Sequence, residues 1–81
     1  MTAPGMNSSE VSLTKIRLDE EVQVIRIDTR DPDKVHRLAS LGILPGARIR
    51  LIQNRSAFIA IVERDQVAFD FEVARAVWVL A

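Results

Sequence analysis

One stretch of the chain decides the fold: RLASLGILPGA, residues 37–47. Its first half carries Leu38 and Leu41 at the three-residue spacing of one helix face. Gly42 follows, and helices commonly end on a glycine because the left-handed backbone there is unfavourable for a residue with a Cβ. Leu44-Pro45-Gly46-Ala47 then fits a type II turn, in which proline fixes the first central residue and glycine takes the positive φ of the second. The stretch predicts a helix end, a tight turn and the start of a strand.

The helix that ends there begins at a capping signal. Asp31 can accept hydrogen bonds from free backbone N–H groups, Pro32 suits the first helical position, and Asp33 faces the positive end of the helix dipole. We therefore predict a helix from about Pro32 to Leu41. Its apolar side is expected to carry Val35, Leu38, Ala39 and Leu41, with Lys34, His36 and Arg37 toward solvent.

The rest of the chain alternates in the manner of short β-strands. About five strands with one inserted helix, in a chain of 81 residues, favour a mainly β fold: a small closed or nearly closed barrel, because closure removes exposed strand edges. The pattern alone does not separate SH3-like from OB-like topology. The predicted strands are residues 22–27, 47–53, 58–62, 67–71 and 77–80, with turns at 54–56 and 64–65 and one helical turn at 72–75 before the last strand.

The composition leaves room for one domain, residues 11–81, after a Thr-, Pro-, Gly- and Ser-rich segment 1–10 that we expect to be a disordered tail. With 11 basic and 11 acidic side chains the net charge is zero, which disfavours generic binding to nucleic acid. The absence of cysteine excludes a disulfide scaffold, a zinc ribbon and a thiolate nucleophile. No apolar run is long enough to span a bilayer and the N-terminus lacks a signal-peptide pattern, so we expect a cytoplasmic protein.

The residues offer little for catalysis or metal binding. His36 is the only histidine, so a transition-metal site would have to combine it with carboxylates, and we expect it to be a solvated surface residue. Ser40 lies one turn further along the helix, without a nucleophile elbow around it. The acidic residues 19–21 point to alternating sides and predict a solvated turn. With only three glycines there is no phosphate loop. We expect no enzyme activity and no required cofactor; direct binding of iron or another metal stays open.

Four arginines could form a basic strip across the middle strands: Arg48, Arg50, Arg55 and Arg64. This is the strongest nucleic-acid feature of the chain, but it lacks interleaved exposed aromatic side chains, and a charged outer face of the barrel is the simpler interpretation. The aromatic residues mostly fall at positions expected to fill the core: Phe58, Phe69, Phe71 and Trp78.

Residues 37–47 resemble the signature RLxxLG(I/V/L/M)xPG(A/S/T) of the FeoA family, and the resemblance extends from about Leu13 to Leu80. It implies an SH3-like barrel, no known catalytic residues and association with FeoB, the membrane ferrous-iron transporter that carries a cytoplasmic GTPase domain. The same module ends DtxR-type metal-dependent repressors. Two positions depart from the family pattern: Asp19 replaces a common glycine, and residues 55–57 replace a glycine- or proline-containing hairpin.

The resemblance implies a non-enzymatic interaction module in bacterial ferrous iron uptake that docks onto or modulates the FeoB transporter GTPase, and reaches the inner face of the membrane only through that partner. The alternatives are a detached regulatory domain of a DtxR-type repressor and, more remotely, a nucleic-acid-binding barrel.

Ile43 and Leu44 lie between Gly42 and Pro45 and cannot easily both point inward, so one is expected to be exposed and available to a partner. The alternative is that both are tucked over the mouth of the barrel. Trp78 faces away from its strand neighbours and is either an amphipathic barrel end or an interface anchor. The expected partner-binding residues are Arg37, Leu41, Ile43, Leu44 and Trp78, supported by the structural turn residues Gly42, Pro45 and Gly46.

Overall fold

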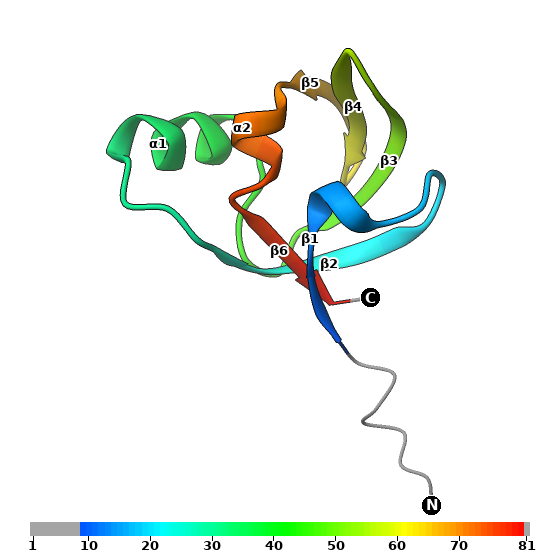
Figure 1. Ribbon diagram of the computed structural model, residues 1–81, viewed down its shortest axis with the longest axis horizontal. Helices are drawn as coiled ribbons and strands as arrows, with labels where there is room; N and C mark the ends of the chain where they lie inside the picture. Colours follow the sequence, from blue (N-terminus) through cyan, green and yellow to red (C-terminus); the bar gives the residue numbers. More distant parts are fainter. Residues whose placement is uncertain (1–8, 81) are drawn as a thin grey trace, which may run out of the picture.

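Six antiparallel strands form one sheet in the computed structural model of the chain, which describes residues 9–80 (Figure 1). The elements are β1 (Glu10–Ser12), the 3₁₀ helix η2 (Leu13–Lys15), β2 (Glu21–Ile27), α1 (Pro32–Ser40), β3 (Arg48–Arg55), β4 (Ala57–Val62), β5 (Asp65–Phe69), α2 (Phe71–Ala74) and β6 (Val77–Leu80). The strand order is β1-β6-β2-β3-β4-β5. The sheet curls around one core into a small barrel, as the strand pattern predicts and as the family resemblance implies for an SH3-like fold, with α1 inserted between β2 and β3.

The sixth strand, β1, begins at Glu10, the last residue of the predicted tail, and its other two residues lie in the predicted domain. Glu10 pairs with Leu80, so β1 adds to the outer edge of β6. That edge would otherwise leave backbone groups unpaired, and a three-residue strand is enough to cover it. Glu10, which the sequence places in the tail, is therefore part of β1; residues 1–8 of the predicted tail lie outside the described residues.

Two bulges bend the sheet. Ile25 interrupts the register of β2 against β6, and Ile52 interrupts that of β3 against β4. A bulge raises the local twist and turns the strand, which is what a small barrel needs at its corners. Because of the first bend, β2 pairs with β3 through residues 21–23 and with β6 through residues 23–27.

The hairpin turns are tighter than the sequence predicts. Arg55 pairs directly with Ala57, so the predicted break at 54–56 shrinks to Ser56, whose φ is 23°. The β4–β5 turn is the two-residue loop 63–64 rather than 64–65, with Glu63 at a φ of 59°. Neither turn contains a glycine, so the sequence carries no strong signal for the residues at which each turn begins and ends.

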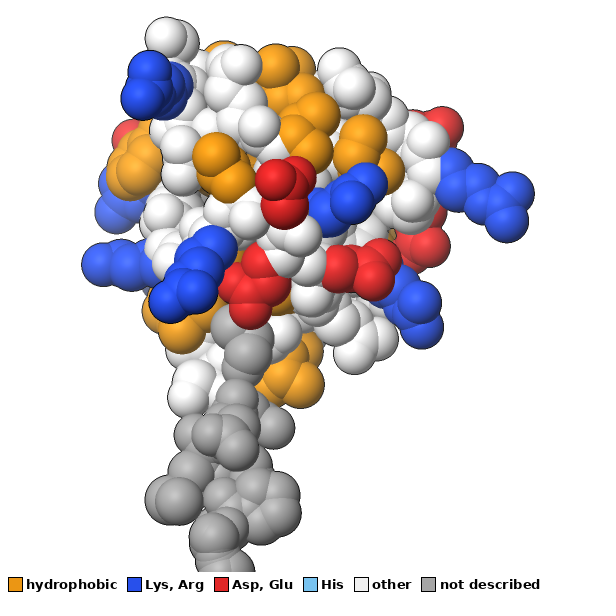
Figure 2. Space-filling model, turned by 90° about the vertical axis from the view of Figure 1, so that its right-hand side faces the viewer, with side chains coloured by type: hydrophobic (Ala, Val, Ile, Leu, Met, Phe, Trp, Pro, Cys, Tyr) orange, Lys and Arg blue, Asp and Glu red, His pale blue; other side chains and the backbone are white. Residues whose placement is uncertain are grey.

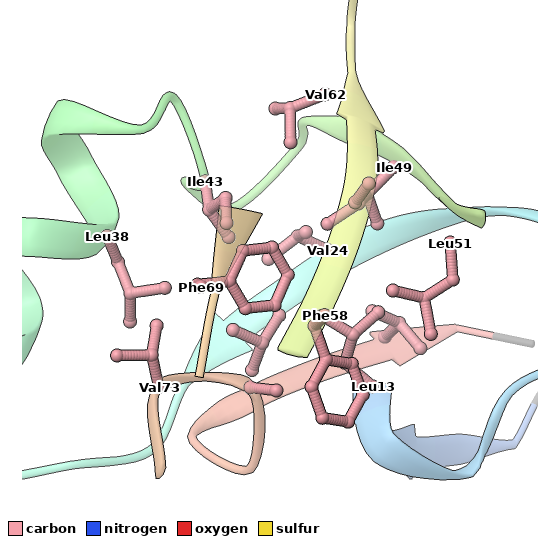
Figure 3. Close-up of a cluster of buried hydrophobic side chains, with 14 of the residues drawn as sticks. Leu13, Val24, Leu38, Ile43, Ile49, Leu51, Phe58, Val62, Phe69 and Val73 are labelled. Atoms are coloured by element: carbon pink, nitrogen blue, oxygen red, sulfur yellow. The ribbon is translucent and has the colours of Figure 1, made fainter. Parts of the chain in front are cut away.

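The core gathers side chains from the strands, from η2 and from the ends of both helices (Figure 3). Helix α1 contributes only Leu38, whereas Val35, predicted on the same apolar side, is 44% exposed, and Ala39 is exposed as well. The reason is visible in Figure 1, where α1 projects from the barrel and meets it near its C-terminal end. The predicted apolar side therefore holds for Leu38, is half-buried at Leu41 and is wrong for Val35 and Ala39.

The end of β5 also differs from the prediction. Phe71 does not continue the strand into the core but begins α2 and is 54% exposed. The side chain of Asp70 accepts a 2.9 Å hydrogen bond from the backbone N–H of Val73, a helix N-cap that ends the strand at Phe69. Phe58 and Phe69 do fill the core, with ring centroids 5.9 Å apart.

The helix end and turn at residues 37–47 form as predicted. The backbone N–H of Ile43 donates to the Leu38 carbonyl at 2.9 Å and that of Gly42 to the Ala39 carbonyl at 3.0 Å, with Gly42 at a φ of 81°. This pair of bonds is a Schellman motif. After it, the N–H of Ala47 donates to the Leu44 carbonyl at 2.9 Å and Gly46 has a φ of 97°, as a type II turn requires.

Replacing either glycine with valine should destabilise the fold by about 1–3 kcal/mol, because a β-branched residue strongly disfavours positive φ. A Cβ at Gly46 would meet no atom within 4 Å, so the cost there is a backbone cost. Gly46→Asn should therefore be milder than Gly46→Val, since asparagine tolerates the left-handed region. Urea denaturation measures both, and equal losses for Asn and Val would contradict the backbone explanation.

Asp19 should be a point of stored strain. Its φ is 66°, and its N–H donates a 2.7 Å hydrogen bond to the Leu51 carbonyl that holds the turn against β3. We expect Asp19→Gly to raise the free energy of unfolding by about 0.5 kcal/mol, the relief of strain less the added entropy of the unfolded chain. Asp19→Ala is the matched control and should lower it, because alanine keeps the Cβ and loses the tolerance of aspartate. Alanine more stable than glycine in urea denaturation would refute the assignment.

Candidate functional site

The predicted contact residues of the helix end do not share one environment. Arg37 is exposed in the last turn of α1, Leu41 is half-buried at the helix C-cap, and Leu44 is 49% exposed. Ile43, in contrast, has no exposed surface and lies in the core. Of the two alternatives for this loop, the structure has the one in which Leu44 faces outward. Ile43 has no surface to offer a partner, because the Schellman closure turns it toward Leu38. We call Arg37, Leu41 and Leu44, which all keep some exposed surface, the helix-end corner.

Trp78 is half-buried on β6 and already has a neighbour on its ring. The guanidinium carbon of Arg26, its cross-strand partner on β2, lies 4.8 Å from the ring centroid, a cation–π contact. Arg26 is in turn held by Glu10 at 3.2 Å and Asp28 at 3.5 Å. Arg26 therefore covers one face of the indole that would otherwise contact a partner. This favours the interpretation of Trp78 as an amphipathic residue at the barrel end over that of an interface anchor.

A cleft of about 460 Å³ lies between α1 and α2. It is lined by Asp33, Lys34, His36, Arg37 and Ser40 from α1 and by Asp70, Glu72 and Val73 around α2. A second cleft, of about 440 Å³, shares Lys34 and Glu72 with the first and is also lined by Trp78. Arg37 and Trp78 thus line different clefts, and the structure does not bring them into one site.

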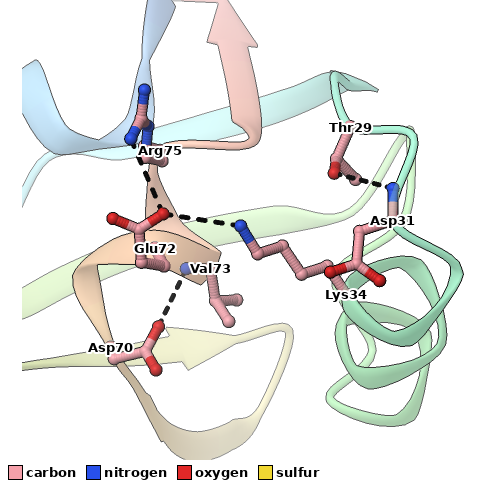
Figure 4. Close-up of polar contacts among 7 residues, drawn as sticks. All are labelled: Thr29, Asp31, Lys34, Asp70, Glu72, Val73 and Arg75. Atoms are coloured by element: carbon pink, nitrogen blue, oxygen red, sulfur yellow. Dashed lines mark hydrogen bonds and ion pairs between the residues drawn. The ribbon is translucent and has the colours of Figure 1, made fainter.

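The ion pair between Lys34 and Glu72 lies at the boundary of the two clefts (Figure 4). Lys34 Nζ is 3.5 Å from Glu72 Oε1, and the same oxygen is 3.6 Å from Arg75 Nη1. These side chains are partly to well exposed, so the pair contributes under about 1 kcal/mol. Helix α1 is therefore fixed firmly at its C-terminal end by burial of Leu38 and only weakly along its first half.

The clefts hold no arrangement suited to covalent or metal chemistry. His36 is exposed on α1 as predicted, and the Ser40 hydroxyl donates to the Arg37 carbonyl at 2.7 Å. Within residues 9–80 no group of three His, Cys, Asp or Glu side chains could hold a metal ion, and no polar or charged residue is buried. Catalytic carboxylates and nucleophiles are usually activated by burial or by a charged neighbour in a closed site. Within residues 9–80, the polar side chains that line the first cleft are instead exposed to solvent or, in the case of Lys34, half-buried.

The arginine strip is a face of mixed charge. Arg48 and Arg50 share the outward side of β3, but Glu21 pairs opposite Arg50, and a carboxylate oxygen of Glu63 accepts a 2.9 Å hydrogen bond from the backbone N–H of Arg48. The predicted acidic turn, residues 19–21, is exposed beside this face. Figure 2 shows basic and acidic side chains interspersed over the side of the molecule that it presents, with apolar groups among them.

Comparison with known proteins gives one family. The family model described as FeoA domain matches residues 11–81. A search of curated protein sequences finds no match. No helix in residues 9–80 is both long enough and apolar enough to cross a membrane.

Solved structures share the fold. A manganese-dependent transcriptional repressor superposes with a TM-score of 0.84 at 25% identity, over 91% of this chain and 42% of the repressor. An iron uptake regulatory protein, FeoA, gives 0.80 at 23% identity, over 89% of this chain and 97% of that one. A zinc complex of FeoA from Stenotrophomonas maltophilia, described as a prokaryotic SH3 domain protein, gives 0.74 at 19% identity, over 85% and 88%. The chain thus spans about two fifths of the repressor and nearly all of the first FeoA protein.

The fold should be independent of metal, because the core is apolar and the described residues supply no set of metal ligands. Adding EDTA to the purified protein should leave its melting temperature unchanged in differential scanning calorimetry. A fall of more than about 4 °C, equivalent to about 1 kcal/mol in a domain of this size and reversed by one specific cation, would contradict this.

Proposed function

The chain belongs to the FeoA family, and we propose that it is a non-enzymatic interaction module of bacterial ferrous iron uptake that docks onto the cytoplasmic GTPase portion of a FeoB-like transporter. The observation that carries the proposal is the exposure of Leu44 on a backbone fixed at both ends. Such a module works in the cytoplasm and reaches the inner face of the membrane through its partner.

The helix-end corner has the properties of an interface anchor. Leu44 lies between Gly42, closed by the Schellman bonds, and Gly46, whose N–H donates to the Val24 carbonyl at 2.7 Å. Binding through a side chain on such a backbone orders little that was free before, so more of the contact energy appears as affinity. Arg37 adds a long side chain with five donors beside the apolar anchor, and arginine is enriched among interface residues that dominate binding.

The absence of catalysis is supported by the chemistry of the clefts. Within the described part of the chain, Ser40 and His36 share one cleft but form no hydrogen bond with each other, and no ionisable side chain is buried. Hydrolysis of the partner's nucleotide would then rest entirely on the partner, with this chain changing the rate or the affinity by contact.

A second candidate function is that of a regulatory domain acting with a metal-dependent repressor. It is favoured by the superposition on the manganese-dependent repressor over nearly the whole of this chain. Gene neighbourhood separates the two candidates: an adjacent reading frame for a large GTPase transporter supports iron uptake, and an adjacent winged-helix protein supports the repressor.

Leu44→Asp should weaken binding to the soluble region of a FeoB-like transporter at least about tenfold, because a charge replaces a desolvated apolar anchor. The matched control is Leu18→Asp, since Leu18 is 46% exposed, close to the 49% of Leu44. Leu18 lies in the turn between η2 and β2. This turn and α1 are at opposite sides of the barrel in Figure 1. The control should bind as the unmodified protein does.

The measurement is a titration of isotopically labelled protein followed by chemical shifts. Shift changes around Arg37, Leu41 and Leu44 support the proposed surface. No shift change at about millimolar partner would overturn the docking proposal. Changes confined to Arg48 and Arg50 would move the site to the mixed-charge face.

A further inference from the structure

Strand β5 has a free backbone edge. It lies at the end of the sheet and pairs only with β4 (Figure 1). The two-residue loop makes Val62 and Asp65 a hydrogen-bonded pair, and such pairs alternate along the ladder. The backbone N–H and C=O groups of Gln66 and Ala68 therefore point away from β4. Within residues 9–80 they form no turn, loop or cap hydrogen bond with another part of the chain.

This edge lacks the features that usually prevent edge-to-edge pairing. Its five residues contain no proline and no lysine, and the register against β4 runs without a bulge. Gln66 and Ala68 are both exposed. The other edge of the sheet, β1, has only three residues and begins with Glu10, whose carboxylate is held by Arg26. The two ends of the sheet thus differ, and only β5 offers a regular ladder position.

We propose that β5 pairs antiparallel with β5 of a second copy of this chain, about a two-fold axis at Val67. In this register Gln66 faces Ala68 of the second copy, so the free groups of both residues form four backbone hydrogen bonds. The charges at the strand ends are compatible with this register: Arg64, in the turn before β5, falls opposite Asp70 of the second copy, whose carboxylate also caps α2, and Asp65 faces Phe69. No like charges oppose each other, which is a condition for stable cross-strand pairing.

The dimer is weak because its interface is small. One pair of five-residue strands buries far less than the roughly 1,200 Å² of a stable interface, so association depends on concentration in the high micromolar range or above. Val67 is half-buried and meets its own copy at the axis, which gives the contact a small apolar centre. The edge shares no residue with the helix-end corner proposed for the transporter.

Charge-pair variants test the register. Gln66→Lys with Ala68→Lys places lysine opposite lysine at both paired positions and should keep the protein monomeric. Gln66→Glu with Ala68→Lys changes the same two residues but places opposite charges together, and should dimerise at least as strongly as the unmodified protein. Sedimentation from about 10 μM to about 1 mM, without any partner protein, separates the species. Fluorescence of Trp78, the only tryptophan, reports whether each variant is folded.

A cysteine at the axis provides a second measurement. The chain has no cysteine, so Val67→Cys can form a disulfide only between copies. Residues facing each other at a non-hydrogen-bonded position lie about 4.5 Å apart between Cα atoms, within reach of a disulfide. Mild oxidation should cross-link Val67→Cys and leave the exposed control Asn54→Cys uncoupled. A monomeric unmodified protein at about 1 mM, equal dimerisation of the two charge variants, or equal cross-linking of both cysteines would overturn the proposal.

Discussion

The hydrogen bond from the Ile43 N–H to the Leu38 carbonyl, 2.9 Å long, is the contact on which the arrangement of the surface depends. It can form only if Gly42 takes a positive φ. Once formed, it brings the side chains of Leu38 and Ile43, five positions apart in the sequence, into the same core and leaves Leu44 outside. Because Leu38 is the only buried residue of α1, this closure is also the attachment of the helix to the barrel.

The turn that follows ties this closure to the sheet. The Gly46 N–H donates to the Val24 carbonyl at 2.7 Å, and the Val24 N–H donates to the Ala47 carbonyl at 2.9 Å. The loop between α1 and β3 is therefore bonded to β2 on one side and closed on its own helix on the other. Loops are usually the mobile part of a fold, but one with its backbone groups paired at both ends presents its side chains at low entropic cost.

Local signals predicted the parts of the fold that depend on local bonds. Gly42 and Gly46 could be placed from sequence because their conformations follow from neighbours within five residues. Val35 and Phe71 could not, since their exposure depends on how far α1 projects and on where Asp70 caps α2. Strand β1 was missed for the same reason: three residues carry no period of their own and become a strand only beside β6. Which of Ile43 and Leu44 points inward likewise depends on packing in the core, which the local sequence does not specify.

The signature stretch contains both positions that the fold constrains and positions that are free to contact a partner. Within the signature at residues 37–47, the positions that the barrel constrains are buried or have a special backbone conformation, as Leu38, Gly42 and Gly46 do. Leu44 occupies an unspecified position of that signature, and the barrel places no packing demand on its exposed side chain. A surface that the core does not constrain can change its partner without loss of stability. Similar barrels can therefore bind different partners in different proteins, with the difference carried by residues that the fold leaves free.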